Sequence, residues 1–410
     1  QPQIRFADCD FVNSEAVVGN SIRFANGDQF GIIDVTSDGY QTIVTVNAGR
    51  PLNWWKYGDL SNVRFLDSNG NMMAKANSFN YVSQYGLQGK IYKYMGRLFS
   101  IEFLKVLTAI ATAITLLMVV YLIWKKYNGI FAGVFYITFL LGQWIVNFAN
   151  NLYWVEFTWF LPMVVGLFCA WKIDDKKSRI ISYLGAYIFV AIKSLCGYEY
   201  ISVVMMGLIT FLLVDLVETI RFKDKEKFKL LVRTILIIGF FALTGFFTAL
   251  CIHASIKPGA DGNIFTGLKL IFRNDIIRRT SGGDINSFEE LIGPEGYAQL
   301  ASTWETIVRY FHFYTEIITG IDGSLFPIFC IIPLLIFIYD IKNGNIDVEV
   351  MTLYVINFIS TMSWFVLAKS HSYVHTHLNY VLWYFGFIQV CLYAVVNKVI
   401  TIYRRLGRED

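Results

Sequence analysis

The sequence predicts an all-α polytopic membrane protein that carries a small β-rich insertion outside the membrane. Of its 410 residues, 55% are apolar and 16% are charged, whereas about 25% of the residues of a soluble protein are charged. The apolar residues gather in stretches close to the ~20 residues that a helix needs to cross the hydrocarbon core. Nine such stretches can be read: 102–124, 129–149, 155–171, 180–196, 200–218, 230–253, 324–340, 350–368 and 378–398.

The few ionisable residues of these stretches support the assignment, because they lie near the ends. A charge costs less there than at the membrane midplane. The residues concerned are Glu102, Lys105, Glu156, Lys193, Asp215, Glu218 and Arg233.

Basic residues are distributed unevenly among the connections and predict the orientation. One set of connections and the C-terminal tail hold Lys125, Lys126, Lys172, Lys176, Lys177, Arg179, Arg221, Lys223, Lys225, Lys227, Lys229, Lys342, Lys398, Arg404, Arg405 and Arg408. The short connections of the other set, 150–154, 197–199 and 369–377, hold only Lys369. Because basic loops stay in the cytoplasm, residues 1–97, the loop 257–323 and the hinge 369–377 are expected outside.

This orientation places the polar N-terminal segment on the translocated side. A removed signal peptide or an additional transmembrane helix before Gln1 would each deliver it there. We favour the helix, which gives ten spans with both ends in the cytoplasm.

The chain is expected to divide into a first external loop (1–97), helices (98–256), a long external loop (257–323), further helices (324–400) and a tail (401–410). The β-branched run Thr42–Val46 and the turn signals at Asn26–Asp28, Asp38–Gly39 and Asn69–Gly70 predict the β-rich insertion.

Short amphipathic helices are expected in both external loops. A helix from about Gly86 to Arg97 would place Leu87, Ile91 and Tyr94 on one face and lie on the bilayer. The long loop contains an amphipathic stretch from Ile264 to Thr280. Two capping boxes, Ser287–Glu290 and Ser302–Glu305, predict helix starts.

The sequence contains none of the signatures of soluble enzymes, such as a P-loop, a dinucleotide fingerprint, a nucleophile elbow or a CxxC pair. It also lacks a sustained basic stripe for nucleic acid.

Candidate chemistry therefore rests on carboxylates in the external segments. These are Asp8 and Asp10 in the first loop, Glu199 in the 197–200 hairpin and Glu156 at a span end. Each could act as a general base, and the Asp pair could also hold a divalent cation or be an ordinary solvated pair.

Several basic residues could bind phosphate on the same face. Arg278 and Arg279 can bind it bidentately or contact anionic lipid headgroups instead. Lys193 could snorkel to the interface, form a structural pair with Glu199, or join the phosphate site.

Three of the five histidines fall in the hinge Lys369–His377, and His253 and His312 are expected on the same side of the membrane. Histidine near its ordinary pKa can donate, accept or carry charge. Lys369, His371, His375 and His377 could therefore bind a phosphate or sugar. A zinc site at these histidines is the alternative, but no fourth ligand is evident and we expect no metal.

Aromatic residues make up 17% of the chain, and many are expected in interfacial belts. Trp154, Trp159, Tyr198 and Tyr200 lie beside the carboxylates in the sequence and could stack on sugar rings. The six cysteines show no disulfide framework, since four lie in or near spans and only Cys9 and Cys196 could meet outside.

Together these features resemble polytopic glycosyltransferases of the GT-C type, which take sugars from polyprenyl-phosphate carriers on the outer membrane face. The matching stretches are the pair Asp8/Asp10, the run Tyr81–Lys90, the run Asn147–Pro162 and the basic long loop. The resemblance covers most of the chain as architecture and a few short stretches as motif. The β-rich insertion within 12–77 departs from the family pattern.

The resemblance implies inverting transfer without a cofactor, with a divalent cation not favoured. Asp8 or Asp10 would deprotonate the acceptor hydroxyl, and Glu199 or Glu156 would position it. The departing phosphate would be neutralised by Arg278, Arg279, Lys193, Lys369, His371, His375 and His377. Fixed positive charge is needed where negative charge develops.

The implied partners are a polyprenyl-phosphate sugar donor, a glycan or lipid acceptor and membrane lipids, but no nucleic acid. The expected location is a bacterial plasma membrane with the active site facing outward. A polysaccharide ligase or polymerase is the close alternative, because His375–Asn379 is similar to the histidine-containing external segments of ligases. A flippase or transporter is a weaker alternative, since no internal repeat is evident and the charges lie at the rims.

Overall fold

The computed structural model describes residues 1–7, 16–37, 41–57, 63–73, 83–257, 260, 262–281, 298, 300–311 and 316–406. The chain divides into two compact units, residues 1–82 and residues 83–410.

The first unit contains an antiparallel five-stranded sheet with the order β1–β4–β3–β2–β5. Its strands are β1 (Gln3–Ala7), β2 (Ser21–Arg23), β3 (Gln29–Ser37), β4 (Gln41–Val46) and β5 (Arg64–Leu66), and a short helix α2 (Trp54–Tyr57) precedes β5. In β4, Thr42, Val44 and Val46 are buried and alternate with half-buried neighbours, as the pleat of a strand requires. The predicted β-rich insertion is confirmed and has a core of its own around Phe6 and Phe65.

The second unit is helical and begins with α3 (Leu87–Met95), which starts close to the predicted residue. The following helices are α4 (Ile101–Lys126), α5 (Gly129–Leu141), α6 (Gln143–Ala149), α7 (Phe157–Trp171), α8 (Lys176–Cys196), α9 (Ile201–Arg221) and α10 (Lys225–Ile256). The C-terminal part contains α16 (Phe326–Lys342), α17 (Val348–Leu367), α18 (Lys369–Val374), the 3₁₀ helix η3 (Thr376–Phe385) and α19 (Phe387–Leu406).

Six described helices are long and apolar enough to span a membrane, so the chain is an integral membrane protein. They are α4, α8, α9, α10, α17 and α19. The predicted span 129–149 is a pair of helices, α5 and α6, bent by 67°. Helix α7 has 15 residues and α16 has 17, so the nine predicted spans are not all present as full-length helices among the described residues.

The ninth predicted span, 378–398, has the wrong boundaries. Residues 376–385 form the buried 3₁₀ helix η3, and the α-helix runs from Phe387 to Leu406. Gly386 separates the two with a φ of +129°. Hydropathy detects burial but does not distinguish a 3₁₀ segment packed inside protein from a helix facing lipid.

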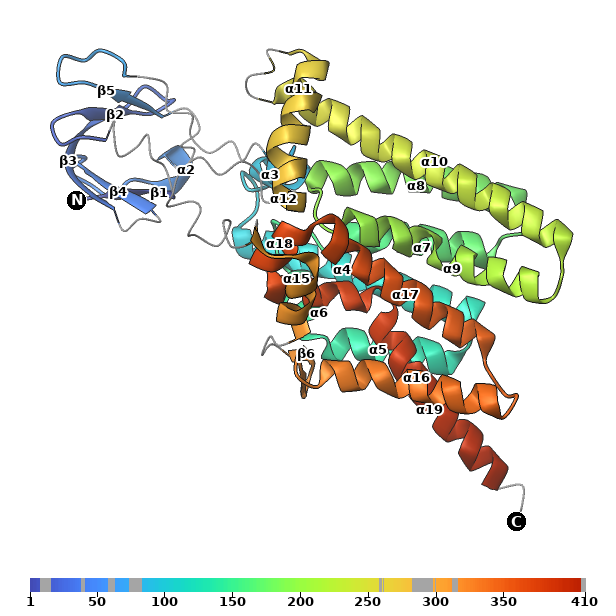
Figure 1. Ribbon diagram of the computed structural model, residues 1–410. Helices are drawn as coiled ribbons and strands as arrows, with labels where there is room; N and C mark the ends of the chain where they lie inside the picture. The colour runs from blue at the N-terminus through green and yellow to red at the C-terminus, as the bar shows by residue number, and fades with distance from the viewer. Residues whose placement is uncertain are drawn as a thin grey trace. The chain divides into compact units, whose positions relative to one another are not determined.

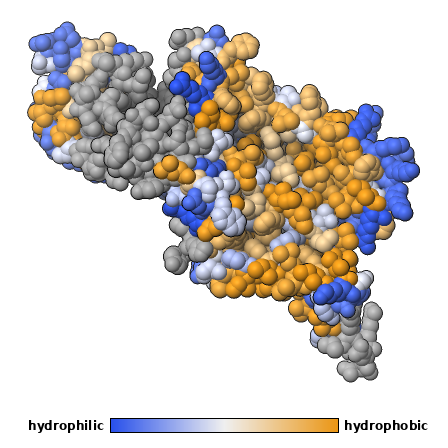
Figure 2. Space-filling view, in the orientation of Figure 1, coloured by the Kyte–Doolittle hydropathy of each residue, from blue (hydrophilic) through white to orange (hydrophobic). Residues whose placement is uncertain are grey.

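Neighbouring long helices run in opposite directions, so their connections gather at two ends of the unit (Figure 1). One end holds connections 172–175, 222–224 and 343–347, and we call it the basic end, because the adjoining helix ends carry Lys125, Lys126, Lys176, Lys177, Arg221, Lys225 and Lys342. The other is the hairpin end, named for residues 197–200. Figure 2 shows hydrophobic residues along the sides of the helices and hydrophilic residues where α9 meets α10.

The long loop contributes several short elements at the hairpin end. The predicted amphipathic stretch is a helix in three parts, α11 (Ile264–Ile271), the π-turn η2 (Phe272–Ile276) and α12 (Ile277–Ser281). Further along are α15 (Thr303–Phe311) and the two-stranded β6 (Glu316–Ile318) and β7 (Ile321–Asp322). The predicted capping box at α15 is confirmed, because Ser302 Oγ accepts from Glu305 N and Glu305 Oε2 accepts from Ser302 N.

Candidate functional site

The candidate site is built around the tight hairpin that joins α8 to α9. Helix α8 ends at Cys196, and the Lys193 ammonium donates to the carbonyl of Gly197 at 2.6 Å. Tyr200 then adopts a left-handed φ of +63° before α9 begins at Ile201. A non-glycine residue in this region of φ/ψ space is uncommon and needs support from its surroundings. The hairpin therefore holds Glu199 on a rigid backbone.

Glu199 contacts an arginine that lies 80 residues away in the sequence. Arg279 Nη2 is 3.4 Å from Glu199 Oε1, and the side chains are 15% and 5% exposed. Arg279 Nη1 also donates to the carbonyl of Asp275 at 3.1 Å. The structure thus brings together the carboxylate of Glu199 and the helix formed by α11, η2 and α12, which carries Arg279 and which we call the arginine helix. The sequence indicated these two features separately.

Lys193 gives this cluster an excess of positive charge. The residue is 1% exposed, and Gly197 O is the acceptor for its ammonium among the described residues. No carboxylate of the described residues lies within ion-pair distance of it, whereas an ammonium has three donors to satisfy. Lys193 and Arg279 therefore face one carboxylate, and the net charge favours an anion.

Because Gly197 has no side chain, the side chains of Glu199 and Gln84 can lie close to its backbone. A Cβ there would lie 2.4 Å from Glu199 Oε2 and 2.6 Å from Gln84 Oε1. Gln84 is buried, and its amide nitrogen donates to the hydroxyl of Tyr153 at 3.0 Å, whereas Oε1 has no partner among the described residues. Gln88 holds the same segment, donating to the carbonyl of Tyr153 at 2.8 Å. Gln84 was not named as a site residue from the sequence, although it lies in the run Tyr81–Lys90 on which the resemblance is based.

A buried ion pair holds the arginine helix in place. Lys257 Nζ lies 2.6 Å from Asp275 Oδ2, and both side chains are about 5% exposed or less. Asp275 belongs to the π-turn η2, which interrupts the helix one turn before Arg279. Sequence reasoning missed this pair. No sequence pattern links the two residues, which are 18 positions apart.

Tyr198 anchors the hairpin to α10. Its hydroxyl lies 2.9 Å from Nδ1 of His253, and both side chains are buried. Desolvation raises the pKa of Tyr198 above its ordinary value, so the phenol stays protonated and can donate to the imidazole. His253 therefore has a structural partner at the hairpin.

The predicted sugar-stacking residues pack mainly on one another. Trp154 stacks on Tyr200 with ring centroids 6.0 Å apart, and Trp159 meets Tyr200 edge-on at 5.2 Å. Trp159 and Tyr200 are fully buried. The Tyr200 ring also contacts Trp364 at 5.3 Å and His371 at 6.2 Å. Whether these rings contact a sugar stays a prediction.

Glu156 precedes α7, which begins at Phe157, so it lies before the helix and not within it. It is fully buried, and neither carboxylate oxygen has a hydrogen-bond partner among the described residues. The preceding residue, Val155, has a φ of +42°, which is a rare conformation for a β-branched residue. Burial raises the pKa of Glu156 well above its ordinary value. Glu156 is thus suited to stay protonated and to donate a proton or a hydrogen bond.

The histidine hinge forms the short helix α18 and packs against α12. The rings of His371 and His375 lie 4.8 Å apart. The hydroxyl of Ser370 donates to the carbonyl of Ala298 at 3.3 Å, and Lys369 Nζ donates to the carbonyl of Ala301 at 2.6 Å. The arginine helix and the histidine hinge are therefore neighbours at the hairpin end.

Some candidates lie outside the described residues. Asp8, Cys9, Asp10 and His312 belong to this set, as do the side chains of Arg278 and His377. Cys196 is buried with a free thiol. Within the described part of the chain, no group of three or more His, Cys, Asp or Glu side chains could hold a metal ion.

The arrangement combines groups that can bind an anion with groups that can hold or accept a proton. Buried Lys193 and partly buried Arg279 can bind an anion. An oxygen of Glu199 has no hydrogen-bond donor among the described residues, and Glu156 is suited to carry a proton. Searches against protein-family models, curated proteins and solved structures find no match to this chain.

Proposed function

We propose that this protein is an integral-membrane glycosyltransferase of the GT-C type. It moves a sugar from a polyprenyl-phosphate donor to a glycan or lipid acceptor on the extracytoplasmic face of a bacterial plasma membrane. The observation that carries the proposal is that two cations, buried Lys193 and partly buried Arg279, lie at the hairpin with Glu199, whose carboxylate is paired with Arg279.

The excess charge fits the leaving group of this reaction. A phosphate that departs from the anomeric carbon gains negative charge as the C–O bond breaks, and pre-positioned cations stabilise that charge. Burying an unpaired ammonium is costly without a compensating anion. Binding of a lipid phosphate would supply that anion, which explains why the cation can be retained at this position.

The carboxylates supply the other half of the reaction. An acceptor hydroxyl would lose its proton to a carboxylate while its oxygen attacks the anomeric carbon with inversion. Glu199 has one oxygen engaged by Arg279 and the other close to Gln84. Asp8 and Asp10 remain the alternative base, and Glu156 is proposed to position the acceptor as a hydrogen-bond donor.

One observation favours a second candidate, a lipid-linked sugar flippase. The bend of 67° between α5 and α6 breaks a span, and broken helices are common in transporters. The charges that we assign to phosphate binding, however, lie at the hairpin end and not at mid-depth of the helices.

The decisive test is a transfer assay with the purified protein in lipid vesicles. Polyprenyl-phosphate sugars with a radiolabelled sugar are supplied together with extracted envelope glycans and lipids. We expect the label to move into a new glycosidic product, and Lys193→Met and Glu199→Gln to abolish that product. Label that crosses the bilayer but stays on its carrier would support the flippase. In a parallel sample that receives a labelled glycan on a lipid diphosphate, transfer of the intact glycan chain would support the ligase.

A further inference from the structure

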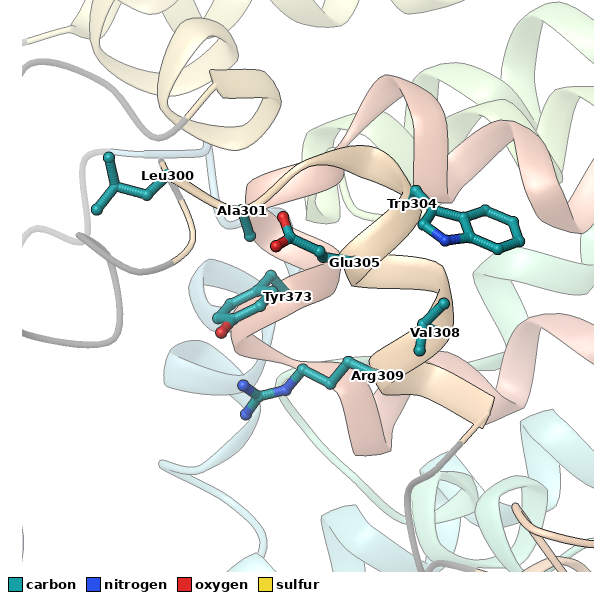
Figure 3. A pocket seen from close by; sticks show the side chains of 7 residues that line it. All are labelled: Leu300, Ala301, Trp304, Glu305, Val308, Arg309 and Tyr373. Carbon is teal, nitrogen blue, oxygen red and sulfur yellow. The ribbon is translucent and has the colours of Figure 1, made fainter.

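A pocket separate from Glu199 and Arg279 lies between α15 and α18. It has a volume of about 600 Å³ and is lined by Leu300, Ala301, Trp304, Glu305, Val308, Arg309 and Tyr373. Figure 3 shows Glu305, Tyr373 and Arg309 on the same side of α15. The size falls within the range of small-molecule sites.

Arg309 is the basic residue that lines this pocket. Its guanidinium lies 4.3 Å above the ring of Tyr373. It forms no hydrogen bond or ion pair with any residue that the structure describes, although Glu305 lies one turn earlier on the same helix. A guanidinium stacked on an aromatic ring is held in one orientation and keeps its N–H edge for a ligand.

The carboxylate of Glu305 is already engaged elsewhere. The Ser302 N–H donates to it at 2.6 Å. This hydrogen bond, with a further contribution from the charge of Lys369, lowers the pKa of Glu305. Glu305 therefore stays ionised and is occupied in capping the helix. The charge of Arg309 is left for an external anion.

The other wall of the pocket is apolar and exposed. Leu300 is 73% exposed, Trp304 71% and Val308 36%, and they follow one another at intervals of four residues. Trp304 and Val308 lie one turn apart on α15 and form an apolar stripe, whereas Leu300 precedes the helix, which begins at Thr303. An apolar stripe with an indole, beside a cation, is typical of a helix at the headgroup level of a bilayer.

We propose that this pocket binds the phosphate headgroup of a membrane phospholipid. Arg309 contacts the phosphate oxygens, and Leu300, Trp304 and Val308 contact the upper part of the acyl chains. A lipid is favoured over a soluble phosphate because the apolar stripe would gain nothing from a soluble one. The inference does not depend on the proposed transfer reaction, since the pocket would bind phospholipid whether or not the protein transfers sugar.

The test is the quenching of Trp304 fluorescence by phosphatidic acid with brominated chains. Wild type and Trp304→Phe are each titrated in detergent micelles. The fluorescence of Trp304 is obtained by subtracting the fluorescence of Trp304→Phe from that of the wild type. We expect the lipid to quench the Trp304 fluorescence saturably. The lipid concentration at half-maximal quenching (the midpoint) should be about 10-fold or more higher in Arg309→Gln, because hydrogen bonds to charged groups are among the stronger ones. Arg233→Gln is the matched control, since Arg233 is exposed on α10 and should leave the midpoint unchanged.

Three results would overturn the proposal. The first is an equal midpoint in Arg309→Gln and the wild type. The second is equal quenching by brominated diacylglycerol, which lacks the phosphate. The third is competition by glycerol phosphate at the same concentration as the lipid, which would make the site one for soluble phosphate. The last two use the Trp304 signal alone, so they remain decisive even if Arg309→Gln does not fold.

Discussion

Lys257 and Asp275 form a buried ion pair, 2.6 Å between Nζ and Oδ2, that joins the end of α10 to the π-turn of the arginine helix. Removal of Lys257 leaves the buried carboxylate of Asp275 without its cation, which costs about 3–5 kcal/mol. We therefore expect Lys257→Met to lower the free energy of unfolding by that amount and Asp275→Leu to lower it as well, measured by denaturant titration in detergent.

The double variant is expected to be more stable than either single variant, because no charge is left unpaired. The exposed pair Lys229–Glu226 is the control, and Lys229→Met should change stability by less than about 1 kcal/mol. A double variant as unstable as the two single effects combined would show that the pair is not coupled.

Gly197→Ala is expected to disturb the site with little effect on folding. The φ of Gly197 is 171°, an extended conformation open to any residue. The added Cβ would nevertheless meet the carboxylate of Glu199 and the amide of Gln84. These are the ends of side chains, so they would shift and weaken the contact with Arg279. We predict lower transfer activity with a nearly unchanged melting temperature.

Gly239→Ala provides the comparison for this experiment. A Cβ at Gly239 meets nothing within 4 Å, and alanine favours a helix more than glycine does. This variant should keep full activity. Equal activity in Gly197→Ala and Gly239→Ala would show that the space beside Gly197 is not needed for activity.

Glu156 should be protonated at neutral pH, because burial raises the pKa of its carboxyl. Infrared difference spectroscopy should show a carboxylic acid band that is absent from Glu156→Gln. The folded state then retains a proton on Glu156 that the unfolded state loses when the pH rises above 4.5, the ordinary pKa of a glutamate. Stability should fall as the pH rises from that value toward the raised pKa.

Glu156→Gln should remove that part of the pH dependence, since an amide does not titrate. Glu226→Gln is a suitable control, because the Glu226 side chain is 86% exposed. An ionised carboxylate at position 156 at neutral pH would contradict the assignment of Glu156 as a hydrogen-bond donor.

The orientation can be tested by cysteine labelling in intact cells. The positive-inside rule places exposed Glu316 outside and exposed Glu226 in the cytoplasm. A membrane-impermeant maleimide should therefore label Glu316→Cys before lysis and Glu226→Cys only after it. The reverse pattern would place the candidate site in the cytoplasm and exclude an extracytoplasmic transferase.

Local patterns predicted much of the fold. The Ser302–Glu305 capping box, the β-branched run of β4 and the apolar stretch of α10 each form from residues close in sequence. Their chemistry is local, so the sequence order is enough to reveal them.

The missed features depend on contacts between distant segments. The pairs Lys257–Asp275, Tyr198–His253 and Gln84–Tyr153 join residues 18, 55 and 69 positions apart, and no periodicity indicates them. Likewise, the apolar run 376–385 gave no sign that it folds as a 3₁₀ helix inside the protein. The candidate residues could be named individually, but the meeting of Glu199 with Arg279 required the structure.

The most direct test of the account is the affinity of the purified protein for a polyprenyl phosphate. Isothermal titration calorimetry in detergent would compare the wild type with Lys193→Met and Arg279→Gln. The account predicts saturable binding by the wild type and a dissociation constant raised about 10-fold or more in each variant, as expected for a lost charge-assisted hydrogen bond. Equal affinity in all three proteins would contradict it.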